Sequence, residues 1–291
     1  MDARSRGAAY LEHLTSADRQ LLVRASGVDA AELSSRPDCV EEALAAPGVF
    51  EAIFPPSLAG HEAMVGVSPF LLFAVAVHRS RAELAEMSYI QEWTGPRQRV
   101  PVFVTDQLRA FLEDACHRLF LTELLASYTH VSSGAVNVRR HGVTYRQRFN
   151  ELDLTSLAGW LDRADDDLRP GLLRRMGDLA LFLTGVFPDH TARSRFAPID
   201  VHRLASGLEA AGGARAGRLA EALEGRGAVG MLEELGRRWY RLAFEGTDVR
   251  TAGLATLESV SDRFVDARRV LNHLTDQHLF VFRAHWFPPP G

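Results

Sequence analysis

The chain contains no lysine, and all 33 of its basic residues are arginine. Without lysine there is no phosphate-binding P-loop lysine, no ATP-binding kinase lysine and no Schiff-base chemistry. The arginine bias, together with abundant alanine, glycine and leucine, indicates a GC-rich coding sequence and a bacterial protein.

Cysteine is almost as scarce, since only Cys39 and Cys116 are present. Two thiols cannot supply a four-cysteine zinc site, a cysteine-ligated iron–sulfur cluster or a disulfide framework, and we expect both to be reduced. The GxSxG, HExxH and EF-hand patterns are also missing from the sequence. Most enzyme classes that a short motif can reveal are therefore excluded.

No apolar run reaches the roughly 20 residues of a membrane-spanning helix, and the N-terminus has no apolar signal core. The most apolar stretch is Leu179–Phe187, which predicts a helix that is buried on all sides. The net charge of −4 provides no general attraction to nucleic acid or to anionic membranes. We expect a cytoplasmic protein that does not bind membranes.

Apolar residues recur at helical spacing along most of the chain, between glycine and proline breaks. This pattern predicts an all-α fold, a multi-helix globular bundle with one small β-hairpin near residues 136–149. Pro55-Pro56 predicts a boundary between a helical N-terminal segment, 1–60, and a main helical domain, 61–291, with a subdivision near 188–198 as an option. The expected main-domain helices are 70–93, 105–129, 154–163, 170–187, 200–211, 215–224, 228–245 and 250–286.

The hairpin carries the most concentrated positive charge. Two alternating segments flank His141-Gly142, a pattern typical of a two-residue hairpin turn. Four arginines lie within ten residues: Arg139, Arg140, Arg146 and Arg148. A two-residue turn places all of them except Arg140 on one face. Because guanidinium groups suit carboxylates and phosphates, these four arginines are candidate binding residues for an acidic protein partner or for nucleic acid. A plain solvated hairpin is the other interpretation, since exposed strands commonly carry basic residues.

Asp178 is the one ionisable residue at the entrance of the apolar stretch. A buried, unpaired carboxylate is very costly, so this residue needs a partner. Arg174 and Arg175 are one helical turn away, and an ion pair with either of them would give Asp178 a structural role. A carboxylate that faces a ligand pocket is the other interpretation, and Asp178 is therefore a candidate binding residue.

Asp114 and His117 are three residues apart, a spacing that helical di-iron proteins use for metal ligands. About one such pair is expected by chance among 37 acidic residues and 11 histidines, so we assign no metal and leave the cofactor unknown. Because of this pair, a helical-bundle metalloenzyme similar to an oxidase is an alternative function.

Two further patterns have plain structural interpretations. Gly225–Gly230 matches GxGxxG, but the preceding residues have a helical rather than a strand pattern, so we expect an interhelical turn. Arg268 and His273 fit the Arg-x4-His spacing of some helical ribonucleases. His273 belongs to a polar helix side with Asp262, Asp266 and Arg269, which we expect to be solvated, and this placement argues against a ribonuclease site.

The sequence thus favours a non-enzymatic interaction or regulatory protein that binds a protein partner, or a second copy of itself. The binding surface would be a helical surface or the arginine hairpin. A metalloenzyme and a nucleic-acid-binding protein that uses the hairpin are the alternatives, and the question of enzymatic activity stays open.

Overall fold

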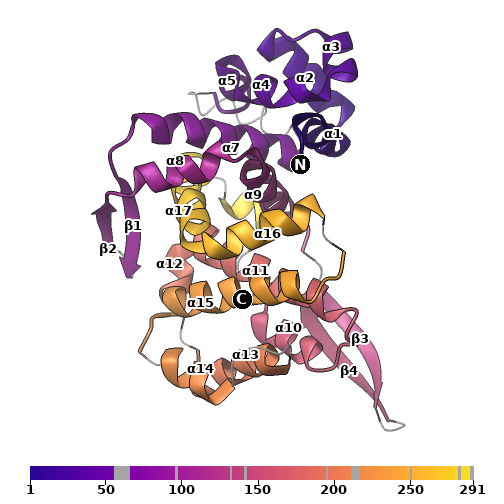
Figure 1. Ribbon diagram of the computed structural model, residues 1–291, viewed down its shortest axis with the longest axis vertical. Helices are drawn as coiled ribbons and strands as arrows, with labels where there is room; N and C mark the ends of the chain where they lie inside the picture. The colour runs from indigo at the N-terminus through magenta and orange to yellow at the C-terminus, as the bar shows by residue number, and fades with distance from the viewer. Residues whose placement is uncertain are drawn as a thin grey trace. The chain divides into compact units, whose positions relative to one another are not determined.

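The computed structural model describes residues 1–55, 66–95, 98–131, 133–140, 143–194, 196–210, 216–223, 225–249, 251–280 and 283–288. Within these ranges helices predominate, and the strands form two two-stranded ribbons (Figure 1). The predicted all-α class with a small hairpin is confirmed. No described helix is both long and apolar enough to cross a membrane. The predicted boundary near residue 60 falls outside the described residues.

The chain divides into two compact units, and each of them is discontinuous in sequence. Unit 1 consists of Met1–Gln91, Pro101–Thr129 and His273–Trp286. Unit 2 consists of Glu92–Val100, His130–Asn272 and Phe287–Gly291.

Unit 1 is built around α7, whose first half is buried. Its helices are α1 (Ala3–His13), α2 (Ser16–Ser26), α3 (Ala30–Ser35), α4 (Val40–Ala45), α5 (Pro47–Ile53), α7 (Pro69–Glu86), α8 (Thr105–Glu113), α9 (Ala115–Ser127) and α18 (Arg283–Trp286). Helices α4, α5, α8 and α9 pack on α7. The Ser68 hydroxyl caps α7 by accepting a hydrogen bond from the Leu71 N–H group, and Pro69 occupies the first turn. Every residue from Phe70 to His78 is buried, as a helix that is apolar on all sides requires.

The predicted helices over 70–93 and 105–129 differ from the structure. The helix expected over 70–93 ends at Glu86 and is followed by strand β1 (Ile90–Gly95), which pairs with β2 (Gln98–Val102). The helix expected over 105–129 breaks at Asp114, whose ψ of 113° is extended. The Asp114 carboxylate accepts a 2.8 Å hydrogen bond from the Cys116 N–H group and starts α9 as a new helix. A single capping side chain thus interrupts a continuous apolar periodicity.

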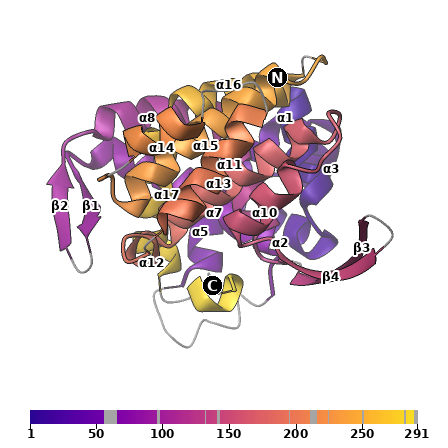
Figure 2. The same cartoon turned by 90° about the horizontal axis from the view of Figure 1, so that it is seen from below.

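Unit 2 is built around two long helices, α11 (Arg169–Val186) and α15 (Ala228–Glu245), which pack along each other. Its other elements are β3 (Ser133–Arg140), β4 (Val143–Asn150), α10 (Leu154–Leu161), α12 (Pro188–Thr191), α13 (Pro198–Ala210), α14 (Ala216–Leu223), α16 (Ala252–Asp262) and most of α17 (Phe264–Leu274). Helices α10 and α13 lie against this pair, as Figures 1 and 2 show. All residues from Leu179 to Pro188 are buried, which confirms the predicted central helix.

The last predicted helix, 250–286, is a series of shorter pieces. α16 ends at Asp262, α17 ends at Leu274, and one π-helical turn, η3 (Thr275–Leu279), follows it. A π-turn inserts an extra residue into the helical repeat and rotates the side chains that follow it. The residues from His273 to Trp286 belong to unit 1.

Candidate functional site

The arginine hairpin is a regular antiparallel ribbon. Its arginine-containing pairs are Arg139–Thr144, Arg140–Val143, Arg146–Asn137 and Arg148–Ala135. Directly opposed residues share a face, and so do alternate residues along a strand. Positions 139, 146 and 148 therefore share one face and position 140 belongs to the other, in agreement with the predicted register. The turn residues, 141 and 142, lie outside the described part of the chain.

The ribbon is an extended element of unit 2. β4 contacts α10, and in Figures 1 and 2 the ribbon runs from α10 beyond the helices of unit 2. A two-stranded ribbon has two faces and two edges, and the arginine face is defined here as positions 139, 146 and 148.

Asp178 lies between α11 and α15. Its Oδ1 accepts a 2.8 Å hydrogen bond from the Tyr240 hydroxyl, and its Oδ2 is 3.9 Å from the Arg174 Nε. Burial raises the pKa of the Asp178 carboxyl, and the Arg174 charge and the Tyr240 hydrogen bond oppose this rise. Asp178 does not line any of the three grooves bounded by α1–α3, by α10 and α12, and by α13–α15. These contacts favour a structural role over a pocket.

Asp114 and His117 lie together at the start of α9, as their spacing predicts. The Asp114 Oδ2 is 3.8 Å from the His117 Nε2, while the His117 Nδ1 is 2.9 Å from the Phe111 carbonyl oxygen. The imidazole is 1% exposed and stacks on the Phe111 ring. Among the described residues, no group of three or more histidine, cysteine or acidic side chains is placed to hold a metal ion.

The Gly225–Gly230 motif begins in the connection between two helices. α14 precedes it and α15 begins at Ala228. Gly225 has a φ of 79°, a left-handed conformation that glycine adopts readily. The expected interhelical turn is confirmed. The motif is not a dinucleotide fingerprint, because that fingerprint needs a strand, not a helix, before its glycines.

Arg268 is the centre of a buried polar network in unit 2 that the sequence did not reveal. It forms ion pairs with Glu92 and Glu233 and donates a 2.8 Å hydrogen bond to the Asn272 side chain. The Asn272 amide in turn donates to the carbonyl oxygens of Thr184 and Gly185 at the end of α11. Arg268 is only 3% exposed. Its guanidinium group is thus buried and occupied by ion pairs and a hydrogen bond within the protein. This argues against a role in phosphodiester cleavage.

Glu83 is the centre of a second network, in unit 1. Its carboxylate accepts a 2.9 Å hydrogen bond from Arg79 and lies 3.1 Å from the His278 Nε2 and 3.4 Å from the His273 Nε2. His278 also packs against the rings of Phe50 and Phe54. His273 is buried, so the prediction of a solvated helix side is wrong at this position.

These two networks could not be found from sequence spacing. Glu83 and His278 are 195 residues apart, and Glu92 and Arg268 are 176 residues apart. The one sequence signal is that polar residues interrupt otherwise apolar helices. Comparisons of the chain with models of protein families, with curated proteins and with solved structures found no match.

Proposed function

We propose that this chain is a non-enzymatic cytoplasmic protein that binds an acidic protein partner through the arginine face of the β3–β4 ribbon. The observation that supports the proposal most directly is the register, which gives positions 139, 146 and 148 one common face. A guanidinium group binds a carboxylate through two parallel hydrogen bonds, so three arginines on one face suit a cluster of carboxylates.

The distribution of charge favours a protein partner. Residues 133–150 contain four arginines and no acidic residue, a charge of +4, whereas the whole chain carries −4 and the remainder therefore −8. A long polyanion such as duplex DNA would extend past the ribbon and be repelled by the acidic remainder. A protein segment that confines its negative charge to a short stretch avoids this repulsion.

Binding of fluorescent poly-L-glutamate to the full-length protein, followed by anisotropy, tests the proposal. Replacing Arg139, Arg146 and Arg148 together with glutamine is expected to weaken binding about tenfold or more. A surface charge pair contributes about 0.2–1 kcal/mol, so three pairs contribute about 0.6–3 kcal/mol, a range that includes the roughly 1.4 kcal/mol of a tenfold loss. Wild-type binding is also expected to weaken as salt is added, because exposed charges are screened.

Two controls separate the arginine face from general charge. Arg140→Gln alters the same ribbon on its opposite face and is expected to leave binding nearly unchanged. The triple change of Arg193, Arg218 and Arg226 to glutamine removes three charges from exposed positions elsewhere in unit 2 and is expected to have a small effect. Equal losses in both triple variants, or no loss in the arginine-face variant, would contradict the proposal.

The same experiment distinguishes the other functions. If duplex DNA binds more tightly than poly-L-glutamate and the arginine-face variant loses that binding, the protein is a nucleic-acid-binding protein. Stoichiometric iron, manganese or zinc in the purified protein would favour the metalloenzyme and argue against a non-enzymatic role.

A further inference from the structure

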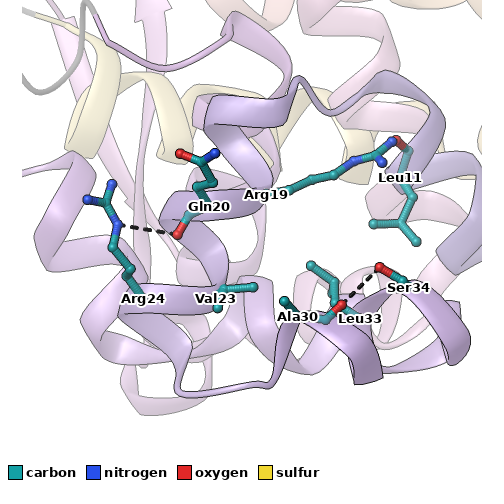
Figure 3. Close-up of a pocket in the computed structure, with 8 residues that line it drawn as sticks. All are labelled: Leu11, Arg19, Gln20, Val23, Arg24, Ala30, Leu33 and Ser34. Carbon is teal, nitrogen blue, oxygen red and sulfur yellow. Dashed lines mark hydrogen bonds between the residues drawn. The ribbon is translucent and has the colours of Figure 1, made fainter.

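A groove between the first three helices of unit 1 lies apart from every residue discussed above. It has a volume of about 530 Å³ and is walled by α1, α2 and α3 (Figure 3). The residues that line it are Leu11, Arg19, Gln20, Val23, Arg24, Ala30, Leu33 and Ser34. A volume of roughly 300–1,000 Å³ is typical of sites for a single small ligand.

The groove has an apolar centre and a cation at each end. Figure 3 shows Val23, Ala30 and Leu33 between the two arginines, with Arg19 reaching toward Leu11. Leu33 is buried and Val23 is half-buried, whereas both arginines are exposed. An apolar surface with a guanidinium group at either end is complementary to an apolar molecule that carries a negative charge.

Both guanidinium groups keep hydrogen-bond donors for a ligand. The Arg19 Nη2 donates to the Leu11 carbonyl oxygen at 2.6 Å, and the Arg24 Nε donates to the Gln20 carbonyl oxygen at 3.3 Å. A guanidinium group has five N–H donors, so several remain on each. Within the described ranges neither arginine forms an ion pair with a carboxylate, and no acidic residue lines the groove.

The walls of the groove are fixed before any ligand binds. At the start of α2 the Thr15 hydroxyl accepts a hydrogen bond from the Asp18 N–H group, and the Asp18 carboxylate accepts one from the Thr15 N–H group. The Asp18 carboxylate also accepts a 2.9 Å hydrogen bond from the Ser68 N–H group. Gly27, with a φ of 78°, ends α2 in a left-handed conformation, and Asp29 caps the start of α3. A preformed groove lowers the entropic cost of binding.

We propose that this groove binds a small apolar carboxylate. Its hydrocarbon part would lie on Val23 and Leu33, and its carboxylate would accept hydrogen bonds from Arg19 or Arg24. The proposal concerns unit 1 and is independent of the ribbon in unit 2, so either can fail without the other.

Calorimetric titration of the full-length protein with decanoate, decanol and decylamine tests this inference. The three probes share a ten-carbon chain and differ only in the head group. Decanoate is expected to bind about tenfold more tightly than decanol, because a hydrogen bond to a charged group is stronger than one to a neutral group. Decylamine is expected to bind most weakly, since its charge matches that of the arginines.

Variants locate the site. Replacing Arg19 and Arg24 with glutamine is expected to lower decanoate affinity about tenfold while decanol affinity stays constant. Ala30→Trp fills the groove from an exposed position and is expected to abolish binding of both probes. Arg4→Gln, an exposed arginine of α1 outside the groove, is the matched control.

Equal affinity for decanol and decanoate would overturn the carboxylate assignment. Unchanged decanoate binding in Ala30→Trp, with the fold intact by circular dichroism, would overturn the groove itself.

Discussion

The carboxylate of Asp178 is accommodated beside an apolar helix surface by two contacts of different kinds. The Tyr240 hydroxyl donates a hydrogen bond to it across α11 and α15, and Arg174 lies one helical turn away. Because burial raises the pKa of this carboxyl, the charged form is less favourable in the folded protein than in the unfolded chain. The contribution of Asp178 to stability therefore decreases as the pH rises through its folded pKa.

Two substitutions of Asp178 should have opposite consequences. Asp178→Asn keeps an acceptor for the Tyr240 hydroxyl and removes the buried charge, so we expect the free energy of unfolding at pH 7 to be unchanged or slightly higher. Asp178→Ala leaves the hydroxyl without this acceptor and should cost about 1–3 kcal/mol. Urea unfolding at pH 7 and pH 4 measures both effects.

The pH dependence and a partner variant provide the checks. Any advantage of Asp178→Asn over the wild type should shrink at pH 4, where the wild-type carboxyl is closer to neutral. Tyr240→Phe should cost about 0.5–1.5 kcal/mol, the net contribution of one hydrogen bond. A large loss in Asp178→Asn would instead point to a role for the charge itself.

Local chemistry at single residues was largely predictable. A threonine with an acidic residue three positions later, as at Thr15 and Asp18, is a capping-box pattern, and glycine after a helical segment, as at Gly27, is typical of a left-handed helix end. Both are present in the structure. Each of these motifs depends on atoms within a few residues, which explains why the sequence is sufficient to identify them.

At the scale of elements, the contact between α11 and α15 depends on glycines where side chains from another helix approach closely. A Cβ atom at Gly177 would lie 2.5 Å from two carbons of the Tyr240 ring. The same approach positions the Tyr240 hydroxyl to reach Asp178, which follows Gly177 directly. Gly236 on α15 also lies close to α11, since its Cβ would be 3.0 Å from the Ala180 Cβ, and it would be 2.5 Å from the Phe264 ring of α17.

Gly177→Ala should therefore destabilise the protein although alanine is the better helix former. Overpacking costs about 1–3 kcal/mol, which is expected to exceed the gain of up to about 1 kcal/mol from helix propensity. Gly171→Ala in the same helix is the matched control, because nothing lies within 4 Å of its Cβ position. It should be neutral or stabilising in thermal unfolding, and equal effects at both positions would contradict the packing argument.

Helix ends that depend on single side chains were harder to predict than helix centres. The apolar repeat runs through Asp114 without a break, yet the Asp114 carboxylate caps a new helix there. The apolar repeat reports which face is buried, whereas the cap depends on whether one side chain bonds to the backbone. The predicted 250–286 helix fails for a related reason, because the backbone of one residue, Arg263, leaves the helical conformation between α16 and α17, with a φ of −112° and a ψ of 30°.

At the scale of the whole molecule, the fold of unit 1 requires the C-terminal part of the chain. His273 and His278 lie against Glu83 of α7, and Trp286 packs on Phe73 of the same helix. Burial alone would raise the pKa of Glu83, but its interactions with His273, His278 and Arg79 hold the pKa well below its ordinary value. The charged form of Glu83 is therefore the one that stabilises the fold.

Glu83→Gln should lower the free energy of unfolding at pH 7 by about 1–3 kcal/mol, the cost of leaving hydrogen-bonded groups without their charged partner. Because the folded pKa is depressed, the stabilisation by Glu83 is fully present above the unfolded value of about 4.5 and is lost as the pH falls further. The difference between variant and wild type should shrink below about pH 4.5. Urea unfolding between pH 3 and pH 8 measures it.

Glu32→Gln provides the comparison, because Glu32 forms an exposed pair with Arg36 at i,i+4 spacing. A surface pair of this type contributes about 0.3–0.5 kcal/mol, so the change should be small at every pH. A Glu83 variant that behaves like the Glu32 variant would show that the network with the two histidines adds little to stability.

The sequence by itself determined the all-α class, the central buried helix and the register of the arginine hairpin, because periodicity, capping and turn length act over a few residues. Only the tertiary structure decided which distant polar groups meet: Glu83 with His278, and Arg268 with Glu92. The tertiary structure also formed the groove between α1, α2 and α3, whose lining residues show no distinctive sequence pattern. The physical reason is that a buried polar group is costly unless it forms a hydrogen bond or an ion pair. Which partner it meets depends on how whole helices pack against one another.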